Sequence, residues 1–457
     1  MIYDICLHVG AGGPWLGNFY LHIKKELERK GLSVVLYTTN NEVKDVFVAN
    51  EETGYIFLDE YTGEVDTDWA LKFVGSLGFH NPKSLYVSEQ KFYDLSESEC
   101  IKYFSRLVHS VELLKDKPAA KFYITYEGDE FDHSIFRILC RMNKGRQIYW
   151  GISNLDLRIH FHDAETRYSQ TPMEPIDVIP EEQLDWIRDY IKKYTSNQTN
   201  LWGDPKKHDV RFELFYIGAA WRKFVKYVKS EETDPRRYLG HSIFMYFRRI
   251  LRRQYAYTKY ADEESLNDIS NCYYFPMHVP YDSQLTQRGL PFYDQVSLIE
   301  TITQYLPYPS KLIVKEHPMG RGLYSIRDMR KLSKLPNVIL LPAYANSHNI
   351  VPKVKGIFVI NSSVGYEGLL YGKPVVTFGR SFYREQGLTI DINSLYELED
   401  VFRKIDTHNI DATSVEKFIY RVWKNTYPVD LYNVDENYFE KANVFIDAIE
   451  QETIKRM

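Results

Sequence analysis

Residues 361–367 combine the side chains and the backbone that an anion site requires. They read Asn-Ser-Ser-Val-Gly-Tyr-Glu and follow a short apolar run at 358–360 that predicts a buried strand. The opening Asn-Ser-Ser is typical of a helix cap, so a helix should begin here, and its first N–H groups and its dipole would attract a phosphate. Gly365 would let a ligand approach the backbone closely, and Glu367 could accept hydrogen bonds from a ribose or sugar hydroxyl.

A second charged loop follows the strand predicted at 311–314. It reads Lys-Glu-His-Pro and occupies residues 315–318. In open parallel sheets ligands bind beyond the carboxyl ends of the strands, so this loop and residues 361–367 should open on one crevice. His317, fixed by the following proline, and Lys315 suit a diphosphate or monophosphate leaving group. Ordinary βα turns with a well-capped helix would give the same pattern, and that interpretation stays open.

An acidic cluster follows the end of a third predicted strand. Residues 127–133 read Glu-Gly-Asp-Glu-Phe-Asp-His. Carboxylates at the end of a strand can act as a general base or nucleophile, because burial and neighbouring like charges tune their pKa values. Glu127 and Asp129 are the preferred pair, and the alternative is an acidic helix start capped by Asp129 or Asp132. No metal site is predicted here, because the cluster lacks an Asp-x-Asp motif.

The start of the chain predicts a βαβ unit. Its pattern gives a strand at 3–9, a helix at 19–30 and a second strand at 33–37. The glycine run at 10–13 lacks the spacing of a dinucleotide fingerprint. It would either leave room for a donor or an acceptor or form an ordinary tight turn.

Composition favours a large α/β protein of two domains, since 457 residues exceed the usual size of one domain. The net charge of −5 gives no reason to expect nucleic acid as a partner. The four cysteines lie far apart in the sequence, which indicates reduced thiols and not a disulfide or zinc framework. A secretory signal and a bilayer-spanning run of about 20 apolar residues are not recognised, so a cytoplasmic location is expected.

A basic stretch lies on a predicted helix near residue 250. Its arginines are Arg248, Arg249, Arg252 and Arg253, and they alternate with apolar residues. Such a helix could rest on an anionic membrane surface, where lipid-linked acceptors would be found. It could equally form a solvated face with nearby acids.

Four segments of the second half resemble the bacterial capsule polysaccharide biosynthesis family, which includes the β-Kdo transferases. They are FPMHVPYDSQLTQRG at 275–289, KEHP at 315–318, NSSVGYEGLLYGKPVVTFG at 361–379 and SFYREQGLT at 381–389. The resemblance implies the GT-B plan, an α/β fold in which two Rossmann-like domains face each other across a cleft. It implies an acceptor domain with a helical insertion at 1–262, a nucleotide-sugar domain at 263–414, and helices at 415–457 that pack back on the first domain.

The same resemblance implies glycosyl transfer from a nucleotide sugar, most directly CMP-Kdo, to a glycan or glycolipid acceptor. Neither a metal nor a cofactor other than this co-substrate is expected, because helix dipoles and cations can neutralise the leaving phosphate. The implied nucleotide-binding residues are Lys315, Glu316, His317, Pro318, Asn361, Ser362, Ser363, Gly365 and Glu367. Those implied for the sugar or the acceptor are Gly10, Gly12, Gly13, Asp282 and Gln284. The catalytic candidates are Glu127, Asp129 and His317.

Two other functions share these features. A glycerophosphotransferase of the teichoic acid type has a similar His-Pro loop and Ser-Ser turn, and it would transfer a phosphoryl-polyol from CDP-glycerol. A capsule assembly or export factor would bind nucleotide or glycan without turnover. The residues alone leave both alternatives open.

Overall fold

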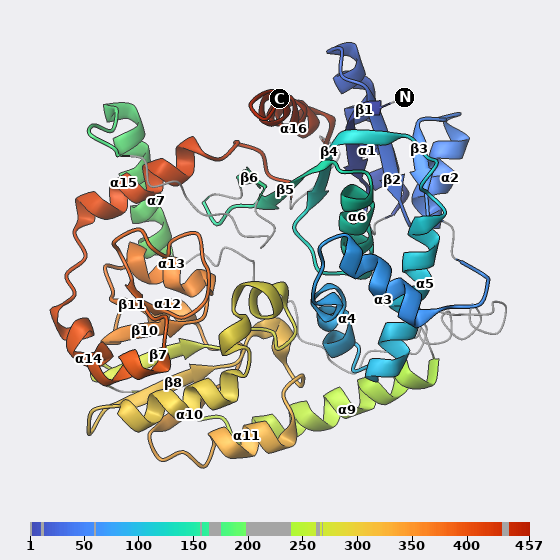
Figure 1. Cartoon of the computed structure of the whole chain (residues 1–457). Helices are drawn as coiled ribbons and strands as arrows, with labels where there is room; N and C mark the ends of the chain where they lie inside the picture. Colours follow the sequence, from blue (N-terminus) through green and yellow to red (C-terminus); the bar gives the residue numbers. More distant parts are fainter. Residues whose placement is uncertain are drawn as a thin grey trace. The chain divides into compact units, whose positions relative to one another are not determined.

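The chain forms two compact units, each built around one six-stranded sheet (Figure 1). Unit 1 comprises Met1–Ser169 and Trp423–Met457, and unit 2 comprises Gln170–Val422. The computed structural model describes residues 2–10, 13–58, 61–155, 158–163, 175–197, 239–261, 266, 268–431 and 438–457.

The sheet of unit 1 is mostly parallel. Its strands are β1 (Ile2–His8), β2 (Val34–Thr38), β3 (Tyr55–Phe57), β4 (Ala119–Tyr126), β5 (Arg146–Ile152) and β6 (Ile159–His162). Their order in space is β3-β2-β1-β4-β5-β6, and only the edge strand β6 runs antiparallel to its neighbour. The central strands are almost continuously apolar, as expected for a sheet that is covered on both faces.

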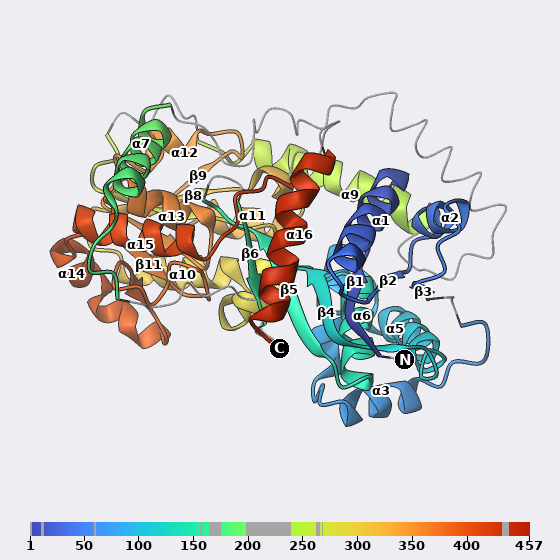
Figure 2. The same cartoon turned by 90° about the horizontal axis from the view of Figure 1, so that it is seen from above.

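Helices cover both faces of this sheet. They are α1 (Pro14–Arg29), α2 (Asn41–Ala49), α3 (Thr67–Ser76), α4 (Val87–Phe92), α5 (Glu97–Glu112), α6 (Phe131–Met142) and α16 (Tyr438–Ile454), with a 3₁₀ turn at Pro82–Leu85. Side chains of α1, α2 and α16 form the core on one face, and those of α3, α5 and α6 form the core on the other. Helix α16 packs against α1, although the two lie at opposite ends of the sequence (Figure 2).

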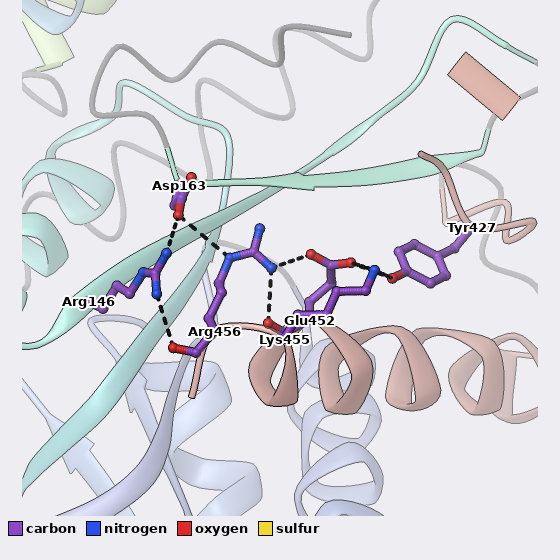
Figure 3. Close-up of polar contacts among 6 residues, drawn as sticks. All are labelled: Arg146, Asp163, Tyr427, Glu452, Lys455 and Arg456. Atoms are coloured by element: carbon purple, nitrogen blue, oxygen red, sulfur yellow. Dashed lines mark hydrogen bonds and ion pairs between the residues drawn. The ribbon is translucent and has the colours of Figure 1, made fainter. Parts of the chain in front are cut away.

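A polar network fixes the end of α16 to the edge of the sheet (Figure 3). Arg146, at the start of β5, donates to Asp163 Oδ2 (2.7 Å) and to the carbonyl oxygen of Arg456 (3.0 Å). Arg456 in turn pairs with Asp163 and with Glu452. Tyr427 donates its hydroxyl hydrogen to Glu452 (2.5 Å). The segment after residue 423 is therefore an integral part of unit 1.

Unit 2 repeats the strand order of unit 1. Its strands are β7 (Cys272–Pro276), β8 (Lys311–Lys315), β9 (Val338–Leu341), β10 (Gly356–Val359), β11 (Val375–Thr377) and β12 (Ile390–Asp391). They are all parallel, in the order β12-β11-β10-β7-β8-β9. Counted from the first strand of its unit, each sheet reads 3-2-1-4-5-6, the order of Rossmann-like domains. The predicted α/β fold of two Rossmann-like domains is confirmed.

Helices also cover the second sheet. They are α7 (Glu181–Asn197), α9 (Leu239–Tyr257), α10 (Gln295–Tyr305), α11 (Ile326–Leu332), α12 (Ser347–Ile350), α13 (Ser363–Leu370), α14 (Leu398–Thr407) and α15 (Ala412–Lys424). Shorter turns lie at Gln284–Arg288, Leu290–Phe292, Pro318–Gly320 and Leu395–Glu397. Helices α10, α11 and α14 share the main core, and Figure 1 shows α13 across the sheet from α10. Among the described helices of both units, none is long and apolar enough to cross a lipid bilayer.

The boundary between the units differs from the predicted one. Helix α7 contacts α13, and α9 contacts α11, so both belong to unit 2. Arg249 Nε donates to the carbonyl oxygen of Arg321 (2.9 Å), and Arg252 donates to that of Leu323 (3.2 Å). These contacts place the division after residue 169, whereas the sequence-based boundary at 262 falls on a residue outside the described ranges.

Helix α1 begins five residues before the start predicted from its apolar pattern. Pro14 occupies its first turn, where the N–H that proline lacks has no partner within the helix. Gly13 is the N-cap residue, so the glycine run leads directly into the helix. The predicted start at Phe19 was wrong because the proline was assigned to the loop.

Candidate functional site

The segments predicted to bind a donor lie at the topological switch point of the second sheet. The chain passes from β7 to β8 and β9 on one side and then returns to β10 on the other, so the switch point lies between β7 and β10. Ligands of open α/β sheets bind beyond the carboxyl ends of the strands at such points. The loop after β7 contains Gln284, and the turn after β10 contains Asn361 and Ser362. The topology thus gives an independent reason to expect a ligand here.

Asn361 joins these two loops. Its side-chain amide donates to the carbonyl oxygen of Gln284 (2.6 Å). Asp282 Oδ1 accepts the main-chain N–H of Gln284 (3.0 Å) and lies 3.1 Å from the hydroxyl oxygen of Ser283, which donates to it. Asp282, Gln284 and Asn361, three residues of the predicted site, therefore lie together. The side chains of Asp282 and Asn361 bind main-chain groups of Gln284 and hold its loop in place.

Helix α13 starts at the predicted turn. Ser362 is its N-cap residue, and the hydroxyl oxygen accepts a main-chain N–H of the first turn (3.3 Å). Ser362 and Ser363 are half-buried. At Gly365 an added Cβ would lie 2.4 Å from the hydroxyl oxygen of Tyr383, which donates to the carbonyl oxygen of Ser362 (2.6 Å). The close approach predicted at Gly365 is thus made by Tyr383, because the glycine leaves room for its ring.

The Lys-Glu-His-Pro loop follows β8, the neighbour of β7. Lys315 ends β8 and is buried. His317 is half-buried and caps the turn Pro318–Gly320, with Nδ1 accepting the N–H of Met319 (3.1 Å). In a neutral ring whose Nδ1 accepts, Nε2 carries the hydrogen and can donate to a phosphate oxygen. The loop therefore supplies a buried cation and an oriented imidazole.

Two carboxyl groups of the predicted nucleotide site are buried. Glu316 is 1% exposed and accepts the hydroxyl hydrogen of Tyr260, while Glu367 is 7% exposed. Burial raises the pKa of Glu316 to about 7, against the effect of the Tyr260 hydroxyl. Burial also raises the pKa of Glu367 to about 7, which the Tyr194 hydroxyl of α7 and the charge of Lys315 oppose. Both carboxyls face protein groups here, and their contact with a nucleotide stays a prediction.

Replacing Glu367 by glutamine should remove part of the pH dependence of stability. A glutamate in an unfolded chain titrates near 4.3, so the folded protein holds this proton more tightly, and stability is lost as the pH rises from about 4.5 to about 7. The neutral variant should match the wild type near the low end of this range. At about pH 8 it should be more stable by up to roughly 3 kcal/mol, and thermal denaturation across this range measures the difference.

Glu316→Gln is the companion variant for that experiment, because burial also raises the pKa of the Glu316 carboxyl to about 7. Each single variant should remove the contribution of its own carboxyl group to the pH dependence of stability, and the double variant should remove both contributions. A profile for Glu367→Gln that runs parallel to the wild type would show that Glu367 is already ionised in the folded protein.

The switch point of the first sheet lies between β1 and β4 and gathers the second set of predicted residues. His8 ends β1, and its Nδ1 lies 2.8 Å from Thr125 Oγ1 on β4. An added Cβ at Gly10 would lie 3.9 Å from the His8 ring, so the glycine borders this cluster. Gly13 precedes α1 as described above, and Gly12 lies outside the described residues.

A charged pair at the start of α6 adjoins His8. His133 Nδ1 lies 3.0 Å from Asp132 Oδ1 and 3.1 Å from Glu130 Oε2. Burial lowers the pKa of His133, but these two carboxylates outweigh it and raise the pKa to about 10. Burial lowers the pKa of His8 to about 3, so that ring stays neutral. Glu130 is the N-cap residue and makes no side-chain capping bond, so the alternative of Asp129 or Asp132 as the cap is wrong.

The two preferred acids lie just beyond β4 in different surroundings. Asp129 is 7% exposed and accepts the hydroxyl hydrogen of Ser88 (2.9 Å). Glu127 Oε1 lies 2.8 Å from His160 Nε2 and 2.7 Å from His162 Nε2. Both acids follow the carboxyl end of a strand next to the switch point, and each is oriented by side chains from elsewhere in the unit.

Sequence reasoning missed the two histidines beside Glu127. His160 and His162 follow it by 33 and 35 positions, and only the antiparallel return of β6 along β5 brings them back. The available signal was the His-x-His spacing, which places two imidazoles on one face of a strand. Tyr194 was missed as well, because its position beside Glu367 depends on how α7 packs on α13.

Comparison with known proteins identifies relatives in capsule biosynthesis. Residues 208–418 match a family described as "Capsule polysaccharide biosynthesis protein". The capsule polysaccharide export protein KpsS of Escherichia coli is 29% identical over 134 residues, which cover 27% of this chain and 34% of KpsS. The capsule polysaccharide modification protein LipB of Neisseria meningitidis serogroup A is 24% identical over 241 residues, 47% of this chain and 54% of LipB. The matched part therefore spans about half of these relatives or less.

Among solved structures, the β-Kdo 2,4 transferase KpsC of Thermosulfurimonas dismutans aligns with 66% of this chain and 78% of its own. The identity is 12% and the TM-score is 0.38, and no function is inferred from this similarity. The similarity to the capsule proteins rests on the sequence matches. The similarity to the capsule polysaccharide biosynthesis family covers residues 208–418, a little under half of the chain.

Proposed function

We propose that this chain transfers a sugar from a nucleotide-activated donor in the synthesis of a capsule or surface polysaccharide. The observation that carries the proposal is the placement of both candidate clusters at the switch points of two Rossmann-like sheets. One cluster has a helix start, a lysine and a histidine, which suit a phosphate, and the other has oriented carboxylates. The similarity of residues 208–418 to the capsule family supports the pathway, and the sequence resemblance favours CMP-Kdo as the donor.

In this proposal unit 2 binds the donor. The start of α13 and the Ser362 and Ser363 hydroxyls hold the phosphate, and Lys315 and His317 stabilise the negative charge that develops as the nucleotide leaves. These groups replace a metal ion at the phosphate, and the nucleotide sugar is the only co-substrate. Glu367 would bind the ribose after the Tyr194 hydroxyl, which contacts its carboxyl group in this structure, has moved away.

Unit 1 binds the glycan or glycolipid acceptor and supplies the carboxylate. Glu127 or Asp129 takes the proton of the acceptor hydroxyl or attacks the sugar as a nucleophile. The bond between the sugar and the phosphate breaks, and the nucleotide leaves with the electron pair. With the carboxylate as base, the acceptor oxygen bonds directly to the sugar. With the carboxylate as nucleophile, a glycosyl ester forms first, the acceptor oxygen then displaces the carboxylate, and the freed carboxylate takes the acceptor proton. Gly10 and Gly13 leave room beside this cluster.

A nucleotide panel tests the proposal. We expect CMP to raise the melting temperature more than CDP, UDP or GDP, and we expect the protein to turn over CMP-Kdo. A response to CDP with turnover of CDP-glycerol would favour a glycerophosphotransferase. Binding without turnover of any donor would favour an assembly or export factor, and a response limited to UDP or GDP would reject the Kdo donor.

Replacing Ser362 and Ser363 together by alanine should weaken CMP binding by about 1–3 kcal/mol, the cost of lost hydrogen bonds to a charged group. Calorimetric titration measures the change. Ser362 also caps α13, so Ser362→Asn is the control that keeps an N-cap acceptor but removes the hydroxyl. Unchanged CMP affinity in the double alanine variant would show that these serines serve only the helix.

We also propose that the chain works at the cytoplasmic face of a membrane, where lipid-linked acceptors are found. Helix α9 presents Phe247 and Leu251 as exposed apolar side chains, and arginines lie between and beside them. That combination suits an anionic lipid surface. Cosedimentation with anionic vesicles tests the contact, and an absence of binding at low salt would reject it.

A further inference from the structure

Glu127, His160 and His162 form a compact cluster at the edge of the first sheet. The two histidines stand two positions apart on β6, so their side chains lie on the same face of the strand. Both Nε2 atoms lie within 2.8 Å of the same carboxylate oxygen of Glu127, and the three donor atoms lie within 4.8 Å of one another. The side chains of Glu127, His160 and His162 are 15%, 13% and 8% exposed, so the cluster is largely buried but not fully closed off from solvent.

The surrounding backbone holds the cluster in place. The N–H of Glu127 donates to the carbonyl oxygen of Trp150 on β5 (2.9 Å). Gly151 pairs with His160 across the strands, and an added Cβ there would lie 2.6 Å from Glu127 Cδ and 2.9 Å from His160 Nε2. The glycine therefore provides the space in which the three polar groups meet. The His162 ring stacks on Tyr149, with 5.3 Å between the ring centroids.

Two imidazole nitrogens and one carboxylate oxygen are a ligand set for a divalent transition metal, with further positions left for water. Bonds of about 2.0–2.1 Å in a tetrahedral site place ligand atoms roughly 3.3 Å apart. The present separations of 2.7 and 2.8 Å between Glu127 and the two histidines need only a small outward rotation of the side chains to reach that value. The remaining separation, between the two Nε2 atoms, is at most 4.8 Å.

We propose that Glu127, His160 and His162 bind a divalent metal ion of the zinc type, which ties the edge strand β6 to the carboxyl end of β4. This goes beyond the proposed sugar transfer and does not depend on it, because a metal bound to Glu127 would leave Asp129 as the carboxylate for transfer. The site lies in unit 1 and not at the donor phosphate, and it departs from the sequence-based expectation that this acidic cluster binds no metal. The competing explanation is that both imidazoles only donate hydrogen bonds to Glu127.

Metal binding by the full chain separates these explanations. After treatment with a chelator, the protein should bind one equivalent of Co²⁺ with the visible absorption of a site of low coordination number. Zn²⁺ should displace the cobalt and raise the melting temperature. His160→Gln and His162→Gln keep a side-chain N–H that can donate to Glu127 but lose the imidazole. Each should weaken metal binding by more than the roughly 10–100-fold typical of changes outside the ligand set.

Three further variants complete the test. Glu127→Gln should also lose the cobalt spectrum. His80→Ala removes an exposed histidine of the same unit and should bind like the wild type. Asp132→Asn alters the neighbouring group of Glu130, Asp132 and His133, whose ligand atoms also lie close together, and it should leave the spectrum intact. The proposal is overturned if the wild type binds neither metal, or if binding survives all three ligand substitutions.

Discussion

Asp129→Asn is expected to lower the rate of sugar transfer by about 10²–10⁴-fold, the contribution of a positioned general acid or base. Donor affinity should stay near that of the wild type, because the lost interaction exists mainly in the transition state. The fold should survive, since asparagine keeps an oxygen that can accept the Ser88 hydroxyl hydrogen. Turnover of CMP-Kdo at saturating donor and acceptor measures the effect.

The other acids of the segment serve as comparisons. Glu127→Gln should also lose transfer if Glu127 is the reacting carboxylate, and the loss should then appear in metal-free protein too. Glu130 is well exposed, so Glu130→Gln should have a modest effect. Asp132→Asn should lower the melting temperature, because it breaks the buried pair with His133. Near-normal rates for both Glu127→Gln and Asp129→Asn would remove the cluster from the mechanism and direct attention to the loop after β1.

His317→Ala should reduce turnover by about 10²–10³-fold, the usual cost of removing one preorganised donor to a developing negative charge. The residue follows β8 next to the switch point, and the bond from Met319 to Nδ1 orients its ring. The loss of that bond should cost about 0.5–2 kcal/mol of stability, as for other N-cap residues. The rate and the melting temperature are both needed to interpret the variant.

His317→Asn separates the two roles of this side chain. Asparagine is a good N-cap residue, so this variant should recover stability while turnover stays low. Recovered turnover would mean that His317 acts only by shaping the loop. A wholly unfolded His317→Ala protein, together with an active His317→Asn protein, would assign the residue to structure alone.

Much of the second sheet could be predicted because its local signals agree with its fold. The apolar runs at 358–360 and 375–378 lie within two residues of the ends of β10 and β11. Ser362 caps the helix between them, and Gly372 follows that helix with a positive φ of 66°, as a helix stop requires. The ends of such short βα units are set mainly by residues that are close in the sequence. The local sequence pattern is therefore sufficient to predict them.

The candidate site was less predictable because its partners come from distant segments. Glu316 and Glu367 have residue types that a nucleotide site would use, yet burial beside Tyr260 and Tyr194 is a tertiary property. Gly365 looks the same in sequence whether a ligand or Tyr383 approaches it. The histidines on β6 reach Glu127 only after the edge strand has turned back. Periodicity and capping rules carry no information on such contacts.

The return of α16 to unit 1 has a consequence for the order of events during synthesis. Domains normally fold in the order in which the ribosome delivers them. Here the continuous segment Gln170–Val422 can complete its sheet first, while Met1–Ser169 still lacks the helix that packs on α1. Until Trp423–Met457 has emerged, the apolar side chains of α1 that meet α16 have no cover. The nascent chain is therefore expected to pass through a stage in which its later half is native and its earlier half is a substrate for chaperones.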